Sequence, residues 1–83
     1  MTPTQAKAHR AAIMNLTADL RDQYGEVENE LRKVRSQMAE IDYPCARMTR
    51  LGDREWDLSA RLSAIDFNIE AKVDAYNAIA LAA

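Results

Sequence analysis

Apolar residues recur through the first half of the chain at alternating steps of four and three. Once Thr17 is counted, the positions with this spacing are Ile13, Leu20, Tyr24, Val27, Leu31, Val34, Met38 and Ile41. This alternation is typical of a coiled-coil seam, a narrow stripe along which one helix packs on another. It predicts one unbroken helix over residues 3–42.

Local signals support the start of this helix. Thr2 can cap it, Pro3 suits the first helical position, and Gln5 stands where a capping box places its glutamine. Gly25 is the only weak position that we expect, because glycine costs about 1 kcal/mol relative to alanine in an exposed helix.

A second seam follows an interruption at Pro44. Its positions are Met48, Leu51, Glu55, Leu58, Leu62, Ile65, Ile69, Val73 and Tyr76, with Ile79 or Ala80 next. Proline cannot continue a helix but can open one. We therefore expect a turn over residues 42–46 and a second helix over 46–81. An alternative start at Asp53, acting as the cap, would leave residues 44–51 as an irregular connector.

The two seams align in an antiparallel hairpin. In such a hairpin the numbers of facing residues have a constant sum. This sum is 89 for Met38 with Leu51, for Leu31 with Leu58 and for Leu20 with Ile69, and half of it falls at the expected turn. Leu31, Leu58 and Leu62 should form the middle of the core.

Charged residues beside the seam favour the same register. It brings Glu30 near Arg61 and Arg21 near Asp66. Each exposed pair contributes only a few tenths of a kcal/mol. Such pairs therefore help to select the register more than they stabilise the fold.

Composition agrees with an all-α fold of one domain over residues 1–83. The chain has only two glycines and two prolines, and helix-forming residues are abundant. So short a chain buries a limited core. We therefore expect an antiparallel, coiled-coil-like two-helix hairpin that pairs into a homodimeric four-helix bundle.

Charge and cysteine content narrow the possible surroundings of the protein. The net charge of −2 disfavours general binding to duplex nucleic acid and to anionic membranes. The single cysteine, Cys45, cannot form an intramolecular disulfide, which favours the reducing cytoplasm. The sequence contains no signal-peptide pattern and no apolar run long enough to span a bilayer.

Residues that could support catalysis are sparse. His9 is the only histidine and has no cysteine or carboxylate within one turn of it, so we expect it to be solvated or packed at the helix end. There is no Glu-x-x-His, no Cys-x-x-Cys and no glycine-rich phosphate loop. A structural role suits Cys45 better than a redox role. We expect no enzyme activity, no cofactor and no metal site.

A second apolar stripe on the second helix is the main candidate for function. It lies off the seam and consists of Trp56, Ala60, Ala64, Phe67 and Ala71, which we name the outer stripe. The corresponding positions of the first helix are polar. An apolar stripe on only one helix indicates a further protein contact, either with a second copy or with another protein.

Two other surfaces are weaker candidates. A basic cluster near the turn consists of Arg32, Lys33, Arg35, Arg47, Arg50 and Arg54. It could contact nucleic-acid phosphates or an acidic protein, or it could be a solvated surface with salt bridges. The open end of the hairpin carries Met14, Leu16, Val73, Ala75, Ile79 and Leu81, which could form an interface or simply thicken the core.

The sequence thus favours a non-enzymatic protein-binding module, such as a small inhibitor or adaptor that docks on a larger protein. Small proteins of phages and mobile elements that block bacterial defence or regulatory systems are similar in general type. The first alternative is a nucleic-acid-binding regulator that uses the arginines near the turn. The second is a structural component of a larger assembly.

Overall fold

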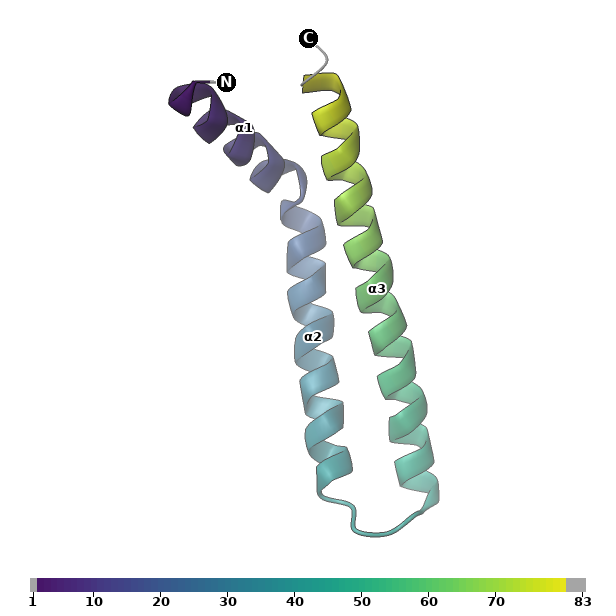
Figure 1. The fold of residues 1–83 in the computed structure, drawn as a ribbon. Helices are drawn as coiled ribbons and strands as arrows, with labels where there is room; N and C mark the ends of the chain where they lie inside the picture. Colours follow the sequence, from purple (N-terminus) through teal and green to yellow (C-terminus); the bar gives the residue numbers. More distant parts are fainter. Residues whose placement is uncertain (1, 81–83) are drawn as a thin grey trace.

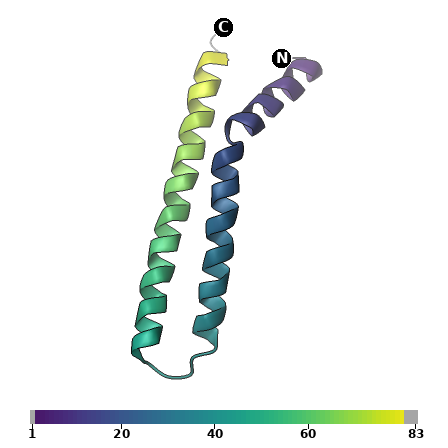
Figure 2. The same ribbon diagram turned by 180° about the vertical axis from the view of Figure 1, so that it is seen from behind.

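The computed structural model describes residues 2–80, which form three α-helices joined by a break and a turn (Figure 1). The helices are α1 (Pro3–Leu16), α2 (Ala18–Ala39) and α3 (Ala46–Ala80). Helices α2 and α3 lie side by side and antiparallel, as both views of the ribbon show (Figure 2). No β-strand occurs within residues 2–80. The all-α fold and the hairpin packing of its helices are confirmed.

The prediction of one unbroken helix over residues 3–42 is wrong, because the chain leaves helical geometry at Thr17. This residue has φ −102° and ψ 3°, and its hydroxyl donates a hydrogen bond of 2.9 Å to the carbonyl of Ile13. Threonine hydroxyls that bond four residues back often bend a helix. Helix α1 consequently tilts away from the line of α2 (Figure 1). Gly25, the expected weak point, lies inside α2.

Arg21 stabilises the break. Its Nη2 donates to the carbonyl of Met14 at 2.6 Å, and its Nε donates to Oγ1 of Thr17 at 3.2 Å. In a continuous helix the carbonyl of Met14 would accept from the amide of Ala18. The arginine thus supplies a donor where the backbone no longer does. The predicted proximity of Arg21 to Asp66 does not give an ion pair, because the guanidinium is engaged at the break.

The ends of the helices follow local signals. The predicted capping box of α1 is present: the amide of Gln5 donates to Oγ1 of Thr2 at 3.2 Å, and the amide of Thr2 donates to Oε1 of Gln5 at 3.0 Å. Helix α2 ends three residues earlier than predicted. Helix α3 begins at Ala46, so the alternative start at Asp53 is wrong. The predicted end at residue 81 lies outside the described residues.

The core is a single layer of side chains between α2 and α3. Its buried members are Val27, Leu31, Val34, Leu58 and Ile65, with Leu20, Tyr24, Met38, Leu51, Leu62 and Ile69 partly buried against them. All eleven are predicted seam positions. Leu58 is fully buried, whereas α1 contributes no residue to this core.

Two ion pairs between the helices flank this layer. Arg54 Nη2 lies 2.6 Å from Oε2 of Glu30, and Arg35 Nε lies 3.2 Å from Oε2 of Glu55. The predicted pairing of Glu30 with Arg61 is therefore wrong. Arg54 and Arg61 are seven residues apart and occupy the same heptad position, so both project from the same flank of α3. Glu30 pairs with the arginine nearer the turn.

The molecule is a rod with principal extents of 58 × 18 × 16 Å. Its radius of gyration is 18.4 Å. A compact domain of this length would have a radius of gyration of about 12 Å. Its accessible surface of 6277 Å² likewise exceeds the roughly 5,000 Å² expected for a compact protein of its mass. An unusual amount of the chain is therefore available to partners.

Candidate functional site

The outer stripe lies entirely at the surface of α3. Trp56, Ala60, Ala64, Phe67 and Ala71 are all exposed. The side chains of Trp56 and Phe67 are 78% and 71% exposed, which is unusual for the two largest apolar residues of the helix. The structure thus agrees with the prediction that the stripe faces outward. Its role as an interface stays a prediction.

The geometry of α3 places the outer stripe opposite the core. An α-helix turns by about 100° per residue, so Trp56 and Phe67, eleven residues apart, return to the same face after three turns. They stand about 16 Å apart along the helix axis. Leu58 and Ile65, which are buried against α2, project from the other side of the helix. A molecule bound to the outer stripe would therefore not compete with α2.

A shallow depression of about 250 Å³ lies beside Trp56 and is lined by Trp56, Ser59, Ala60 and Ser63. The two serines were not among the predicted residues. Their spacing could have indicated them, since residues three and four apart share a helix face. Small side chains at these positions leave room for a partner's side chain next to the indole ring.

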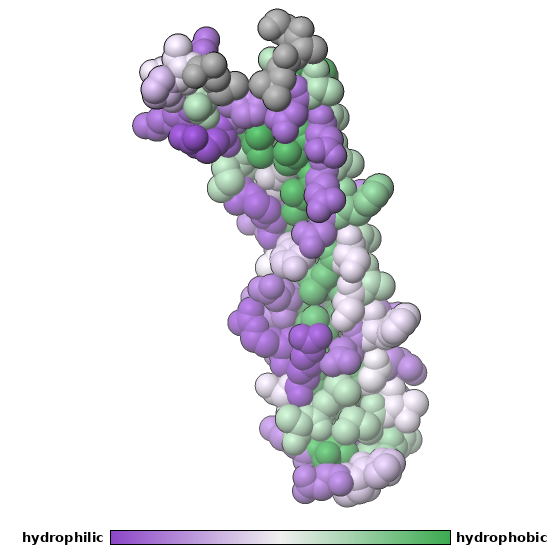
Figure 3. Space-filling model, in the orientation of Figure 1, coloured by the Kyte–Doolittle hydropathy of each residue, from purple (hydrophilic) through white to green (hydrophobic). Residues whose placement is uncertain are grey.

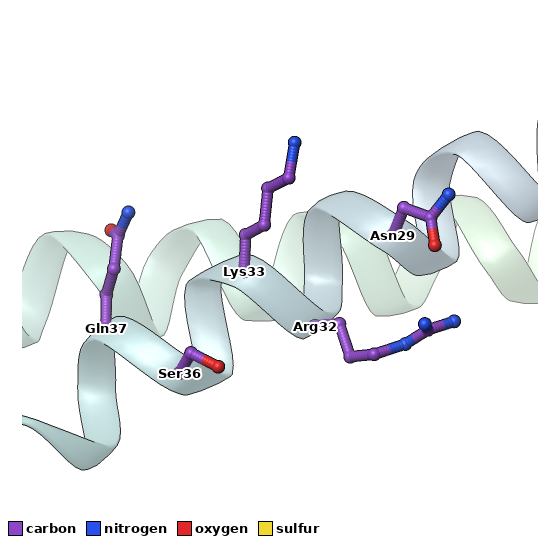
Figure 4. A pocket seen from close by; sticks show the side chains of 5 residues that line it. All are labelled: Asn29, Arg32, Lys33, Ser36 and Gln37. Atoms are coloured by element: carbon purple, nitrogen blue, oxygen red, sulfur yellow. The ribbon is translucent and has the colours of Figure 1, made fainter.

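The outer side of α2 is different in character. The positions expected to be polar there are all exposed, namely Asp19, Asp22, Glu26, Asn29, Lys33 and Ser36 in α2, with Asn15 in α1 and Glu40 just after α2. A depression of about 560 Å³ on this side is lined by Asn29, Arg32, Lys33, Ser36 and Gln37. Their side chains extend from the ribbon without converging on a common point (Figure 4). This surface offers polar contacts but no apolar anchor.

The residues of the basic cluster lie on both α2 and α3, and two of them form ion pairs with a glutamate of the other helix. Three of its six residues pair with glutamates: Arg32 with Glu28 at 3.3 Å, Arg35 with Glu55 at 3.2 Å, and Arg54 with Glu30 at 2.6 Å. Within residues 2–80, the other three, Lys33, Arg47 and Arg50, form no ion pair. Half of the predicted positive charge is thus compensated within the protein.

The open end retains apolar surface. Met14 is 51% exposed, Leu16 is 41% exposed and Ile79 is 77% exposed. Val73 is half-buried and Ala75 is exposed, whereas Leu81 lies outside the described residues. Apolar atoms gather where α1 and α3 diverge (Figure 3). The break at Thr17 explains this surface, because α1 tilts away instead of covering α3.

His9 connects α1 to α3. Its Nε2 lies 2.8 Å from Oδ1 of Asn77, a hydrogen bond in which the ring N–H donates to the amide oxygen. The ring centroids of His9 and Tyr76 are 5.0 Å apart at a tilt of 45°. The histidine thus packs against the last turns of α3 described by the structure, which agrees with one of the two environments expected for it.

No protein-family model, curated protein or solved structure matches this chain. Its own surfaces therefore provide the evidence for its function. Across residues 2–80, no three side chains of His, Cys, Asp or Glu gather as metal ligands would. None of the helices in that range has the length and apolar character needed to cross a membrane.

Proposed function

We propose that the chain is a non-enzymatic protein-binding module, a small inhibitor or adaptor that docks on a larger protein through the outer stripe of α3. The observation that carries this proposal is the exposure of Trp56 and Phe67 on one side of a helix whose opposite side packs in the core from Leu51 to Ile69. The alanines between them let another helix approach closely.

The physical chemistry of the two aromatic side chains supports this choice. Each aromatic ring buries a large apolar area when it finds a partner, and tryptophan is among the residues most enriched at binding hot spots. Exposed apolar patches on small proteins commonly mark interaction sites. The rod shape adds to the effect, because a single-layer core leaves the whole far side of α3 uncovered.

The size, acidic charge and simple architecture also suit one kind of inhibitor, namely those that phages and mobile elements direct against bacterial defence or regulatory systems. We propose that the chain acts in the cytoplasm. The lone Cys45 is the basis for that location.

A homodimer is a second candidate, because the outer stripe is complementary to itself in one antiparallel register. Residue numbers that sum to 127 would face each other there: Trp56 would meet Ala71 of the second copy, and Phe67 would meet Ala60. Each large ring would then lie over a small residue. The four helices of such a dimer would lie in a row rather than in a square, because the stripe is opposite the seam.

The nucleic-acid alternative has less support. Three of the six residues in the basic cluster are already paired with glutamates, and the net charge is −2. Phosphate binding would also fall steeply with salt, whereas an apolar dock would be much less sensitive. Salt dependence of partner binding therefore separates the two functions. A purely structural role in a larger assembly would use the same apolar surface.

The test is the double variant Trp56→Ala/Phe67→Ala. We expect it to keep its helix content by circular dichroism, because neither side chain contributes to the core, and to lose the proteins that the wild-type chain retains from host lysate. The matched control is Lys33→Ala/Ser36→Ala on the outer side of α2, which should retain them. A folded double variant that keeps its partners would contradict the proposal.

A further inference from the structure

The outer stripe is framed by carboxylates at both ends. Asp53 and Asp57 lie around Trp56, and Glu70 and Asp74 lie around Ala71; all four are exposed, and we name them the acidic rim. At about 100° per residue, all four project from the same half of α3 as the stripe. The basic residues Arg61 and Lys72 project from the flanks nearer α2. The middle of the stripe carries no charge.

The acidic rim is not compensated within the protein. Within residues 2–80 no lysine, arginine or histidine nitrogen lies within 4.0 Å of these four carboxylates, whereas Glu28, Glu30 and Glu55 are each paired. Asp53 with Asp57, and Glu70 with Asp74, are also like-charged pairs four residues apart. Such pairs destabilise a helix slightly. Cations supplied by a partner would reduce the repulsion within both pairs.

The acidic rim opposes a second copy as the occupant of the stripe. In the register that places each aromatic ring over an alanine, Asp53 lies opposite Asp74 of the second copy and Asp57 is level with its Glu70. A parallel arrangement would place each carboxylate at the level of its own equivalent. Both arrangements gather like charges beside an apolar contact, where they are costly.

We propose that the outer stripe and acidic rim together bind a basic amphipathic helix of another protein. This inference rests on the proposed protein-binding function and specifies the partner. The bound helix has an apolar face with gaps for Trp56 and Phe67, and it carries lysine or arginine near both ends. Charges of opposite sign across the rim select the partner and speed its association.

The spacing of the rim defines the partner further. The centres of the two carboxylate pairs are 17 residues apart, which corresponds to about 25 Å along a helix. A straight partner helix of roughly 20 residues spans both pairs. Its basic groups must then recur about 17 residues apart, with uncharged small or aliphatic residues between them on the contacting face.

A pair of synthetic peptides tests this. The first is a 20-residue amphipathic helix without aromatic residues, with leucine and alanine on one face and two lysines at each end. The second has glutamate in place of the lysines. Trp56 is the only tryptophan of the chain, so its fluorescence reports binding directly. We expect the lysine peptide to shift the emission to the blue and to bind at least about tenfold more tightly than the glutamate peptide.

Charge-neutral variants test whether the acidic rim causes the preference for the lysine peptide. In Asp53→Asn/Asp57→Asn/Glu70→Gln/Asp74→Asn the preference for the lysine peptide should disappear. In the matched control, three exposed carboxylates of α2 and the one that follows its last residue are neutralised instead, as Asp19→Asn, Asp22→Asn, Glu26→Gln and Glu40→Gln. The preference should then remain.

Three results would overturn the inference. Equal binding of both peptides would refute charge selection and leave the apolar dock intact. Binding of neither peptide would refute the helical partner. Light scattering that gives twice the 9.4 kDa mass, with Trp56 emission already blue-shifted without peptide, would assign the face to a second copy. The proposed function itself fails only if Trp56→Ala/Phe67→Ala keeps its protein partners.

Discussion

The two ends of this hairpin carry apolar residues with the same spacing, yet only one end forms a core. From the turn to Leu20, the seam residues of α2 and α3 are buried or half-buried, and Leu58 has no exposed surface. At the open end no seam residue is buried: Ile13, Val73 and Tyr76 are half-buried and Ile79 is exposed. Met14 and Leu16, which lie beside the seam, are also exposed, and α1 has no buried residue. A heptad pattern thus provides apolar side chains, but burial requires that the two helices stay in contact side by side.

The difference follows from a few hydrogen bonds at one residue. Thr17 is itself 98% buried, with 2% of its surface exposed, and its hydroxyl bonds to the carbonyl of Ile13 and accepts from Arg21. These contacts stabilise a bend in the chain at the level where the seam would otherwise continue. Beyond the bend, α1 contacts α3 through His9, which bonds to Asn77 and packs near Tyr76, and much of the apolar surface stays exposed.

The largest effect is expected in the middle of the core. Leu58→Ala should lower the free energy of unfolding by about 2–5 kcal/mol, because it removes buried methyl groups and leaves a cavity. Ile79→Ala at the open end should change it by less than about 0.5 kcal/mol. Urea unfolding followed by circular dichroism measures both.

If Leu58→Ala does not fold, Leu58→Met, which conserves volume, should still fold with a loss below about 1.5 kcal/mol. Equal losses for Leu58→Ala and Ile79→Ala would show that the two ends do not differ in burial.

The contact between His9 and Asn77 at the open end should contribute less than Leu58 to the free energy of unfolding. His9→Ala removes the hydrogen bond to Asn77, with an expected loss of about 1 kcal/mol confined to α1. The expected result is faster hydrogen exchange of the α1 amides, because a 14-residue helix is marginal without tertiary contacts, while exchange in α2 is unchanged.

A double-mutant cycle isolates this contact. His9→Ala, Asn77→Ala and the double variant should show effects on α1 exchange that do not add, since the two side chains act as a pair. Additive effects, or no change in α1, would mean that the hydrogen bond does not hold α1 against α3.

The smallest effect is expected at the ion pairs near the turn. Arg54 and Glu30 are both about half exposed, so Arg54→Ala should cost roughly 0.2–1 kcal/mol, and less at high salt. Arg50→Ala, a residue with no ion pair within residues 2–80, is the control and should be close to neutral. Thermal unfolding at two salt concentrations distinguishes the variants. A larger loss for Arg50 would reverse our assignment of the pairs.

Much of the hairpin could be predicted from the sequence because it depends on the spacing of the apolar residues and on one proline that interrupts the helix. The seam of α2 and α3 follows from apolar spacing, and the turn follows from Pro44. The outward direction of Trp56 and Phe67 follows from the same period, since residues off the seam cannot face α2.

The remaining features depend on side-chain choices that spacing does not determine. Glu30 could reach two arginines at the same heptad position, and only the folded geometry selects Arg54. The break depends on the hydroxyl of Thr17, which donates a hydrogen bond to the backbone carbonyl of Ile13, four residues earlier. A polar, β-branched residue within the seam, Thr17, was the available signal, and the heptad count treated it as an ordinary member of the stripe.

The break at Thr17 also means that a small change of backbone angle at one residue displaces the whole of α1. Helix α1 has 14 residues and is about 21 Å long, so a rotation of only about 10° at one residue moves its far end by nearly 4 Å. Because α1 has no buried residue, such a swing disturbs no core packing. It would instead break the contacts of His9 with Asn77 and Tyr76 and those of Arg21 at the break. The direction of α1 is therefore set by a few polar contacts, whereas the direction of α3 is set by the core.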